Sequence, residues 1–275
     1  AKTVFGRTAV PEEPGWQAAH ERLVRTLRRA AKARSHATLD NADLRGWHYV
    51  LTGGVLGMLS PHGFDQGMTG RYAFQQDDYG LCRYGVERLR LVLDAADRRP
   101  TAVGHLPDRS STILGTAAAQ LLDLPLRPYV PGTPDTLVVV YDLAEAEAEA
   151  GRDVLAGLSA RHPGEILYEH ATCWTDPPPV TADVSTLLRQ FGGPPWGTRL
   201  VGDTPERVPP DDRPVAEIVT DLVAAEPAVD EGDGKTPPDT DQALAAFVAG
   251  VASTWLDGPR APMRSPGPVP SSRFV

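Results

Sequence analysis

Short apolar runs alternate with helical patterns through the middle of the chain. The runs predict four buried strands, at Thr101–Gly104, Leu126–Val130, Thr136–Tyr141 and Ile166–Cys173. Residues Leu137–Val140 are apolar on both faces, which suits a parallel strand covered by helices on each side. Helical patterns occupy Thr112–Leu122 and Ala144–Ala160, where Gly151 is a weak point. Strands that alternate with helices predict an α/β fold with a mainly parallel twisted sheet, in which the first and third strands are central neighbours.

Helical patterns also flank this core on both sides. They predict helices at Trp16–His36, through Trp47 to Leu51 after a cap at Asp40 or Asn41, and at Val86–Ala96, Val184–Phe191, Pro214–Ala225 and Gln242–Leu256. The prolines at 177–179 are expected to end the sheet, and residues 192–210 to be irregular. These patterns predict an N-terminal helical segment with a long polar loop at 1–98 and an α/β core at 99–200. A Pro-rich acidic linker and a loosely structured C-terminal helical arm follow at 201–275.

The C-terminal arm needs support from the rest of the protein. The stretches at 226–241 and 259–275 are rich in proline or acidic residues and hold too little apolar surface to fold alone. Between them, apolar side chains form a stripe of four residues, Phe247, Val251, Trp255 and Leu256. We expect this stripe to dock either on the main core or on another subunit.

Charge and composition exclude several classes of protein. The net charge of −9 argues against a protein that binds duplex nucleic acid through a general attraction to phosphate. Nearly all basic residues are arginine, which favours codon bias in a high-GC bacterial genome over an arginine-specific function. No apolar run approaches the roughly 20 residues that span a bilayer. The first seven residues lack the apolar stretch of a signal peptide, so the cytoplasm is the expected location.

A long polar segment, Ser60–Gly80, separates two of the N-terminal helices. Structureless connections of this length are uncommon in compact proteins and often carry function. The segment supplies eight polar groups that could line a pocket: His62, Asp65, Gln66, Arg71, Gln75, Gln76, Asp77 and Asp78. The pair Asp77-Asp78 could hold Mg²⁺, as could Asp211-Asp212, although solvated loop charge is the favoured interpretation of both.

The two cysteines, Cys82 and Cys173, are too few for a disulfide scaffold. His170 and Cys173 have the spacing of metal ligands, but on a strand they point to opposite faces, so a buried pair is favoured over a metal site. Cys82 could act as a nucleophile with His62 or His105 as base, although a buried apolar role is favoured. Common dinucleotide, P-loop, serine-hydrolase and zinc-protease motifs are absent from the sequence. No cofactor and no metal site are predicted.

The first predicted strand of the core leads into a recognisable pattern. Val103-Gly104 ends the strand, a short loop carries Asp108-Arg109-Ser110, an alanine-rich helix contains Ala117-Ala118-Ala119, and Leu124-Pro125 follows it. This pattern resembles the first half of a type I phosphoribosyltransferase. Val138–Asp142 then lies where that family places its ribose-phosphate recognition strand. The resemblance covers about 75 of the 275 residues and implies an α/β scaffold with a ligand site at the strand ends.

The phosphate-binding motif of the resembled family is altered in this chain. In the family, two adjacent acidic residues end the strand, and a Thr-Gly-Thr loop holds the 5′-phosphate at a helix N-terminus. Here Tyr141 replaces the first acid and Asp142 alone carries over as the second. Leu143–Glu149 replaces the loop with three glutamates, which repel phosphate. Residues 131–135 also leave no room for the mobile catalytic hood, so the resemblance implies a scaffold without phosphoribosyl transfer.

The turn after the first core strand is the predicted ligand site. Unsatisfied N–H groups and the dipole make a helix N-terminus attractive to anions, and an arginine or hydroxyl there adds hydrogen bonds. The predicted ligand-binding residues are His105, Asp108, Arg109, Ser110, Ser111, Thr112 and Asp142. The alternative is that Ser110 or Ser111 merely caps the helix.

Three functions remain open from the sequence. The first is a phosphoribosyltransferase-like protein that binds a small phosphorylated molecule without transferring a phosphoribosyl group. The second is a structural or assembly subunit that engages a protein partner, or a second copy of itself, through its C-terminal arm. The third is an enzyme of unknown reaction that uses the segment 60–80 together with the cleft at the strand ends.

Overall fold

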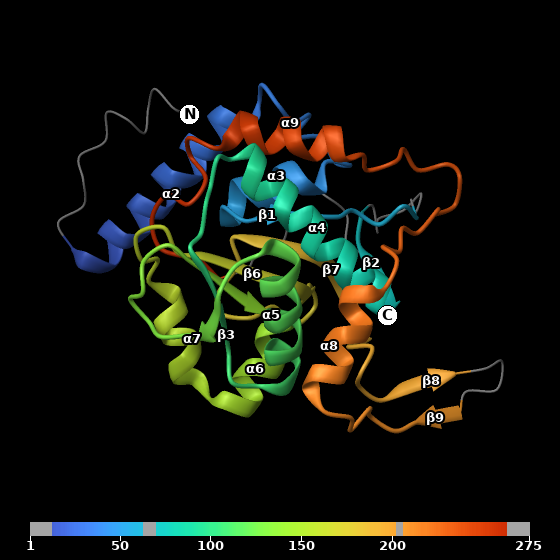
Figure 1. Ribbon diagram of the computed structural model, residues 1–275. Helices are drawn as coiled ribbons and strands as arrows, with labels where there is room; N and C mark the ends of the chain where they lie inside the picture. The colour runs from blue at the N-terminus through green and yellow to red at the C-terminus, as the bar shows by residue number, and fades with distance from the viewer. Residues whose placement is uncertain (1–12, 63–69, 202–205, 263–275) are drawn as a thin grey trace.

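A parallel sheet of seven strands lies at the centre of the protein (Figure 1). The computed structural model describes residues 13–62, 70–201 and 206–262. The strands are β1 (Val55–Leu56), β2 (Tyr72–Gln76), β3 (Ala102–His105), β4 (Leu126–Pro128), β5 (Thr136–Val140), β6 (Ile166–Cys173) and β7 (Val184–Gly193). Their order is β1-β7-β6-β5-β3-β4, and β2 pairs with the end of β7 beyond β1. The predicted α/β class with a mainly parallel sheet is confirmed.

The two strands expected at the centre of the sheet are parallel neighbours. β3 pairs with β5 from Ala102 opposite Thr136 to His105 opposite Val139. β4 covers the outer side of β3, and β6 covers the outer side of β5. Every residue of β5 is buried, as its continuous apolar run predicts.

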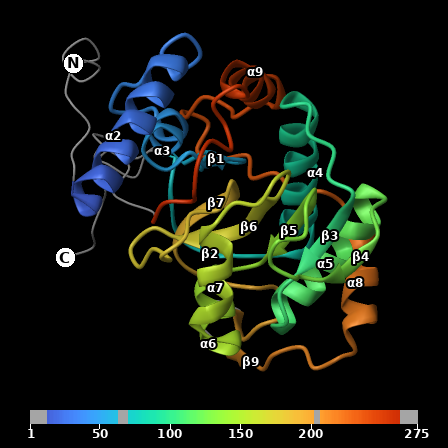
Figure 2. The same ribbon diagram turned by 90° about the vertical axis from the view of Figure 1, so that its left-hand side faces the viewer.

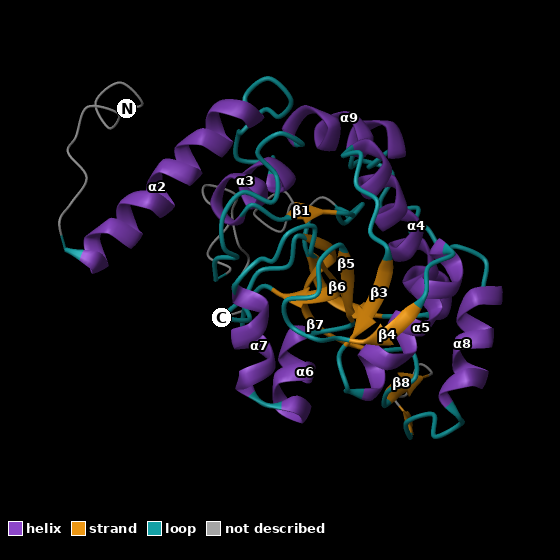
Figure 3. Ribbon diagram, turned by 60° about the vertical axis from the view of Figure 1, so that its left-hand side comes forward, coloured by secondary structure: helices purple, strands orange, loops and turns teal. Residues whose placement is uncertain are grey.

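Eight described helices surround the sheet (Figure 3). They are α2 (Pro14–Ala33), α3 (Leu44–Thr52), α4 (Tyr79–Ala95), α5 (Arg109–Leu122), α6 (Leu143–Ala150), α7 (Arg152–Ser159), α8 (Val215–Ala224) and α9 (Asp241–Val251). Alternate residues of a strand face opposite sides. Accordingly, Leu137 and Val139 pack with α4, α5, α8 and α9, whereas Val138 and Val140 pack with α6 and α7. Figure 2 shows α6 and α7 on one side of the sheet and α4, α5 and α8 on the other.

The helix predicted at Val184–Phe191 is wrong, because this segment forms the long strand β7. Its apolar residues Val184, Leu187, Leu188 and Phe191 have the spacing of one helix face, which explains the error. In the protein β7 pairs with β6 on one side and with β1 and β2 on the other. Those long-range pairings override the local pattern and carry the sheet past the prolines at 177–179.

Four further expectations are corrected by the structure. The segment Ser60–Gly80 contains β2, although its residues Asp65 and Gln66 lie outside the described part of the chain. The helix expected at 144–160 is divided into α6 and α7 at Gly151, whose φ of 85° is accessible to glycine but costly for other residues. Asp43, rather than Asp40 or Asn41, caps α3 by accepting from the Gly46 N–H. The irregular stretch holds an antiparallel pair, β8 (Arg199–Val201) and β9 (Glu206–Val208).

The C-terminal arm docks on the chain's own core. α9 packs against α4 and α2 (Figure 1). In the apolar stripe of α9 and the residues after it, Phe247, Val251 and Trp255 are buried and Leu256 is partly buried. The ring of Phe247 meets that of Tyr49 edge-on at 5.7 Å. The stripe expected from the sequence therefore acts within one chain.

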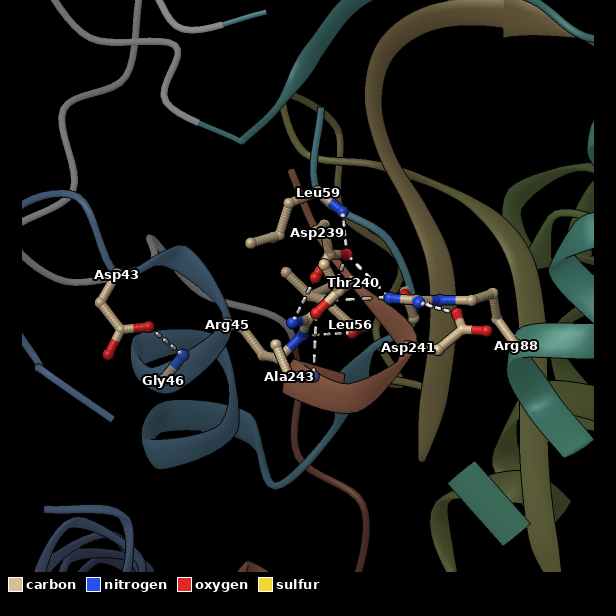
Figure 4. A network of polar contacts seen from close by, with 11 residues as sticks. Asp43, Arg45, Gly46, Leu56, Leu59, Arg88, Asp239, Thr240, Asp241 and Ala243 are labelled. Carbon is tan, nitrogen blue, oxygen red and sulfur yellow. Dashed lines mark hydrogen bonds and ion pairs between the residues drawn. The ribbon is translucent and has the colours of Figure 1, made fainter. Parts of the chain in front are cut away.

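Ion pairs also hold the segment before α9 against the core. Asp239 accepts two hydrogen bonds from Arg45, at 2.8 and 2.7 Å, and one of 2.9 Å from Arg88 (Figure 4). Arg88 also donates to Asp241 at 2.5 Å. We call these four residues the Asp239 clasp. It joins α3, α4 and the start of α9, which are far apart in the sequence.

The N-terminal helix α2 lies on the surface with one side against the core. Its residues Arg29 and Ala33 are buried, and Arg29 donates to the Leu51 carbonyl. Trp16, in its first turn, is 66 % exposed. In the described part of the chain, neither α2 nor any other helix is long and apolar enough to cross a membrane.

Candidate functional site

The order of the strands reverses between β3 and β5. From β3 the chain proceeds outward to β4, and from β5 it proceeds the other way to β6 and β7. Open parallel sheets bind ligands outside the carboxyl ends of their strands at such a reversal, because the diverging connections leave a crevice there. The residues that leave β3 and β5 at this end are Leu106–Asp108 and Tyr141–Asp142. The predicted site residues therefore lie at the topologically favoured position.

The N-terminus of α5 is capped by Asp108. Its side chain accepts from the Ser111 N–H at 2.8 Å, so Asp108 takes the capping role that the alternative interpretation gave to Ser110 or Ser111. The Ser111 hydroxyl instead accepts from the Tyr141 N–H at 3.3 Å and ties α5 to the end of β5. The second oxygen of Asp108, Oδ1, is buried and has no hydrogen-bond partner among the described residues.

The Arg109 side chain is bound by backbone carbonyls of the protein itself. Its guanidinium donates to the carbonyls of Asp211 and Arg213, both at 2.9 Å. These contacts fasten the segment before α8 to the start of α5. The sequence predicted that Arg109 would contact an anion, but its guanidinium already donates to these two carbonyls.

Ser110 binds a glutamate of the facing helix. Its hydroxyl donates to Glu145 at 2.6 Å and accepts from the Trp196 indole N–H at 3.0 Å. Burial, together with the neighbouring Asp108 and Asp142, raises the pKa of Glu145 to about 6, although the Ser110 hydrogen bond acts in the opposite direction. The crevice therefore holds a carboxyl group that changes charge near neutral pH.

Asp142 caps α6, as Asp108 caps α5. It accepts from the Ala144 N–H at 2.8 Å, and its other oxygen accepts from Arg189 at 2.7 Å. The fully buried Glu169 accepts from the Leu143 N–H at 2.9 Å. Burial and then Asp142 raise the pKa of Glu169 to about 8. Side-chain carboxylates thus occupy the start of α6, where the resembled family holds phosphate.

His105 opens onto a cavity beside the crevice. The cavity measures about 480 Å³ and is lined by His105, Leu106, Pro107, Pro128, Tyr129, Pro131 and Val154. The His105 Nδ1 atom lies 2.8 Å from the Leu106 carbonyl and 3.3 Å from the Thr112 hydroxyl. Donation to that carbonyl places the proton on Nδ1, which leaves Nε2 for a ligand. A mostly apolar cavity of this size with two polar side chains, His105 and Tyr129, suits a small organic molecule.

A larger cavity lies at the opposite end of the strands. It measures about 750 Å³ and includes Arg98, Arg99 and His162 among its lining residues. Two of its other charged residues are already paired, because Arg161 binds Asp183 and Glu165 binds Arg260. Its position at the amino ends of the strands makes it the less favoured ligand site despite its size.

The sequence predicted the crevice residues at the start of α5, but not those supplied by β7 and the segment after it. His105, Asp108 and Ser110–Thr112 do gather at the start of α5, as expected. Trp196 and Arg189 were missed because the segment that supplies them was interpreted as a helix and an irregular stretch. The sequence predicts that the glutamates after Asp142 repel phosphate. It contains no local pattern that predicts the hydrogen bond between Ser110 and Glu145.

Replacing Glu145 by glutamine is expected to alter the pH dependence of stability. The folded-state pKa of about 6 exceeds the ordinary 4.5, so the folded protein binds this proton more tightly and loses stability as the pH rises from 4.5 to 6. Glu145→Gln keeps an acceptor for Ser110 without the charge. Urea unfolding should find it more stable than wild type by about 1 kcal/mol at pH 7.5, after discounting for partial exposure, and equal to it at pH 4.5.

The control for this prediction is Glu149→Gln, which changes an exposed glutamate of the same helix. It is expected to leave stability nearly unchanged at both pH values. A Glu145→Gln variant that is less stable than wild type at pH 7.5 would show that the carboxylate stabilises the crevice, contrary to the account above.

Comparison with known proteins assigns no family to the chain. The sequence matches no protein-family model and no curated protein. The candidate site is accordingly defined by its own residues, by the strand order that places them together, and by the cavity beside His105.

Proposed function

We propose that the protein binds a small phosphorylated molecule at the carboxyl ends of β3 and β5, without transferring a phosphoribosyl group. The observation that carries the proposal is the cavity beside His105, which lies at the carboxyl ends of β3 and β4, next to the point where the strand order reverses. An organic part of the ligand enters the cavity, and its phosphate lies between His105 and the start of α5. The phosphoribosyltransferase-like scaffold inferred from the sequence is part of this proposal.

Two kinds of donor support the binding of a phosphate here. The N–H groups of Arg109 and Ser110, in the first turn of α5, have no acceptor within the helix. The imidazolium form of His105 donates from Nε2 while Nδ1 stays on the Leu106 carbonyl. Glu145 opposes binding when ionised, so the affinity for phosphate should rise as the pH falls toward 6.

The start of α6 supports the absence of transfer. Asp142 accepts from the first N–H groups of that helix, and Arg189 is paired with Asp142. A ribose phosphate would have to displace Asp142 and approach Glu145 and Glu169. The contacts favour a protein that holds a ligand at α5 and lacks the second phosphate site needed for the reaction.

The two other interpretations receive less support. An enzyme built on segment 60–80 needs several groups of that segment in the crevice, yet His62 pairs with Asp230 at 2.9 Å, and Asp77 is buried with its carboxylate bound to the Tyr141 hydroxyl. A subunit that grips a partner with its arm needs a free apolar stripe, whereas α9 already lies against α4 and α2.

Titration calorimetry with nucleoside monophosphates, ribose 5-phosphate and pyrophosphate tests the proposal. We expect at least one of them to bind wild type, and His105→Asn to bind it about tenfold or more weakly, as loss of a charge-assisted hydrogen bond of about 1.5–3 kcal/mol implies. Asparagine retains a donor near the Leu106 carbonyl. The matched control, His62→Asn, changes a histidine outside the cavity and should bind like wild type.

Two results would contradict the proposal. Equal binding by His105→Asn and wild type, or no binding of any phosphate compound, would exclude the site. Release of pyrophosphate from phosphoribosyl diphosphate in the presence of acceptor bases would contradict the absence of transfer.

A further inference from the structure

A second group of reactive side chains lies inside the protein, beneath the first turn of α4. Asp77 directly follows β2, Cys82 lies in α4, and His170 lies in β6. The three are 3 %, 0 % and 0 % exposed. One ligand atom from each, a carboxylate oxygen, the thiol sulfur and an imidazole nitrogen, lies within 4.8 Å of the other two. Tyr141, which leaves β5 at the crevice, links the crevice to this group, because its hydroxyl donates to Asp77.

The imidazole of His170 has an unused nitrogen that faces this group. Its Nε2 atom lies 3.0 Å from Asp77 Oδ2, yet the two atoms are not aligned as a hydrogen bond. Nε2 therefore has no hydrogen-bond partner among the described residues, although the side chain is fully buried. The Cys82 sulfur lies 3.4 Å from the same Asp77 oxygen. A buried polar atom without a partner is costly, which calls for a group that satisfies it.

The surroundings of His170 fix its orientation. Its Nδ1 atom lies 3.1 Å from the Tyr168 hydroxyl, which in turn lies 2.7 Å from the Thr186 hydroxyl. Tyr168 can donate to Thr186 and accept from Nδ1, which leaves the lone pair on Nε2. Metal-binding histidines are commonly held in this way by a partner on the second nitrogen. Gly85 gives the pair room, because a Cβ there would lie 2.8 Å from both Nδ1 and the tyrosine oxygen.

Asp77 is held by the same surroundings. Its Oδ1 atom accepts from the Asp78 N–H at 2.9 Å, and its Oδ2 atom accepts from the Tyr141 hydroxyl at 2.7 Å. The carboxylate is therefore oriented independently of Cys82 and His170. Three side chains, from the turn after β2, from α4 and from β6, converge on one point, and neighbours fix two of them.

We propose that Asp77, Cys82 and His170 bind a zinc ion. Zinc bonds of about 2.0–2.3 Å at tetrahedral angles separate the nitrogen, oxygen and sulfur atoms of these three ligands by about 3.3–3.6 Å. The observed separations of 3.0 and 3.4 Å are within a few tenths of an ångström of these values. Sulfur and imidazole ligands select zinc over Mg²⁺ or Ca²⁺, which take oxygen ligands.

Charge balance supports the same ion. Zinc takes the place of the Cys82 thiol proton, which passes to solvent, and the thiolate and the Asp77 carboxylate together neutralise the two positive charges. The buried site is then neutral as a whole. Because the ligands are buried, the ion enters as the protein folds, and its binding contributes to stability by joining β2, α4 and β6.

Metal analysis of the purified protein tests the proposal. The full chain is refolded with excess zinc, dialysed without chelator and assayed for zinc per chain. Wild type and Cys173→Ser, the matched control at the other cysteine, should each retain about one zinc, and Cys82→Ser and His170→Gln should retain less than a tenth of that. Chelator treatment should lower the thermal midpoint of wild type and leave that of Cys82→Ser unchanged.

Cobalt substitution keeps the test decisive if Cys82→Ser or His170→Gln fails to fold. Cobalt bound to a thiolate gives a charge-transfer absorption band, and the chain has two cysteines. The band should be present in wild type and unchanged in Cys173→Ser. The proposal is overturned if refolded wild type retains no zinc, if cobalt gives no thiolate band, or if the band is lost with Cys173.

Discussion

Replacing Asp239 by alanine is expected to lower the free energy of unfolding by about 3 kcal/mol. The change removes the shared partner of Arg45 and Arg88, which are 6 % and 1 % exposed (Figure 4). Breaking a buried ion pair from one side costs about 3–5 kcal/mol, because the remaining charge stays buried without compensation. The lower end applies here, since Arg45 and Arg88 keep the Leu56 and Gly57 carbonyls as acceptors. Urea unfolding at neutral pH measures the change.

The matched control for the Asp239 clasp is Asp257→Ala. Asp257 pairs with Arg28 at 2.8 Å, but the two side chains are 41 % and 57 % exposed. Exposed pairs contribute about 0–1 kcal/mol, so this variant should unfold almost like wild type. Equal stability of the two variants would show that the Asp239 clasp does not hold the C-terminal arm.

Replacing Arg260 by methionine is expected to have an effect at least as large, about 3–5 kcal/mol at neutral pH. Arg260 is fully buried and binds two buried carboxylates, Asp183 and Glu165, at 2.7 Å each. Methionine fills a similar volume and leaves both carboxylates without this partner, although Arg161 remains beside Asp183. Arg99→Met, at an exposed arginine paired with Asp94, is the control and should cost less than about 1 kcal/mol.

The effect of Arg260→Met should depend on pH. Burial acts to raise the pKa of Asp183, but Arg260 and Arg161 more than offset it, and the pKa lies below the ordinary 3.8. The stability from this pairing is therefore fully present above about pH 4 and is lost as the pH falls through the lower folded-state pKa. Unfolding measured from pH 7 downward should show the gap between the two proteins closing below pH 4. A constant gap would assign the loss to packing.

The sequence predicted the elements whose local pattern agrees with their final environment. β3 and β5 are short, mostly apolar strands buried in a parallel sheet, β6 is a buried strand that begins with apolar residues, and α5 is an alanine-rich amphipathic helix. In these segments the spacing of apolar residues and the tertiary contacts favour the same structure. Agreement between local and global preference is what makes a segment predictable.

Where local pattern and tertiary contact disagree, the prediction failed. The segment of β7 has helical spacing but gains hydrogen bonds from strands on both sides. Asp239 pairs with Arg45, which is 194 positions away in the sequence, and with Arg88, which is 151 positions away. No local pattern in the sequence indicates such pairs. Distant contacts also explain Arg109. The sequence predicts that its side chain contacts a ligand, but the guanidinium donates to the carbonyls of Asp211 and Arg213, which are 102 and 104 positions away.

The location of phosphate binding distinguishes the two ends of the sheet most directly. Amide correlation spectra of the isotope-labelled protein, titrated with a nucleoside monophosphate, report which backbone groups respond. If phosphate binds at the start of α5, the largest shifts fall at His105, Arg109 and Ser110, beside the cavity at the carboxyl ends of the strands. Largest shifts at Arg98, Arg99 and His162, at the opposite end of the sheet, or a spectrum that does not change, would contradict the proposed site.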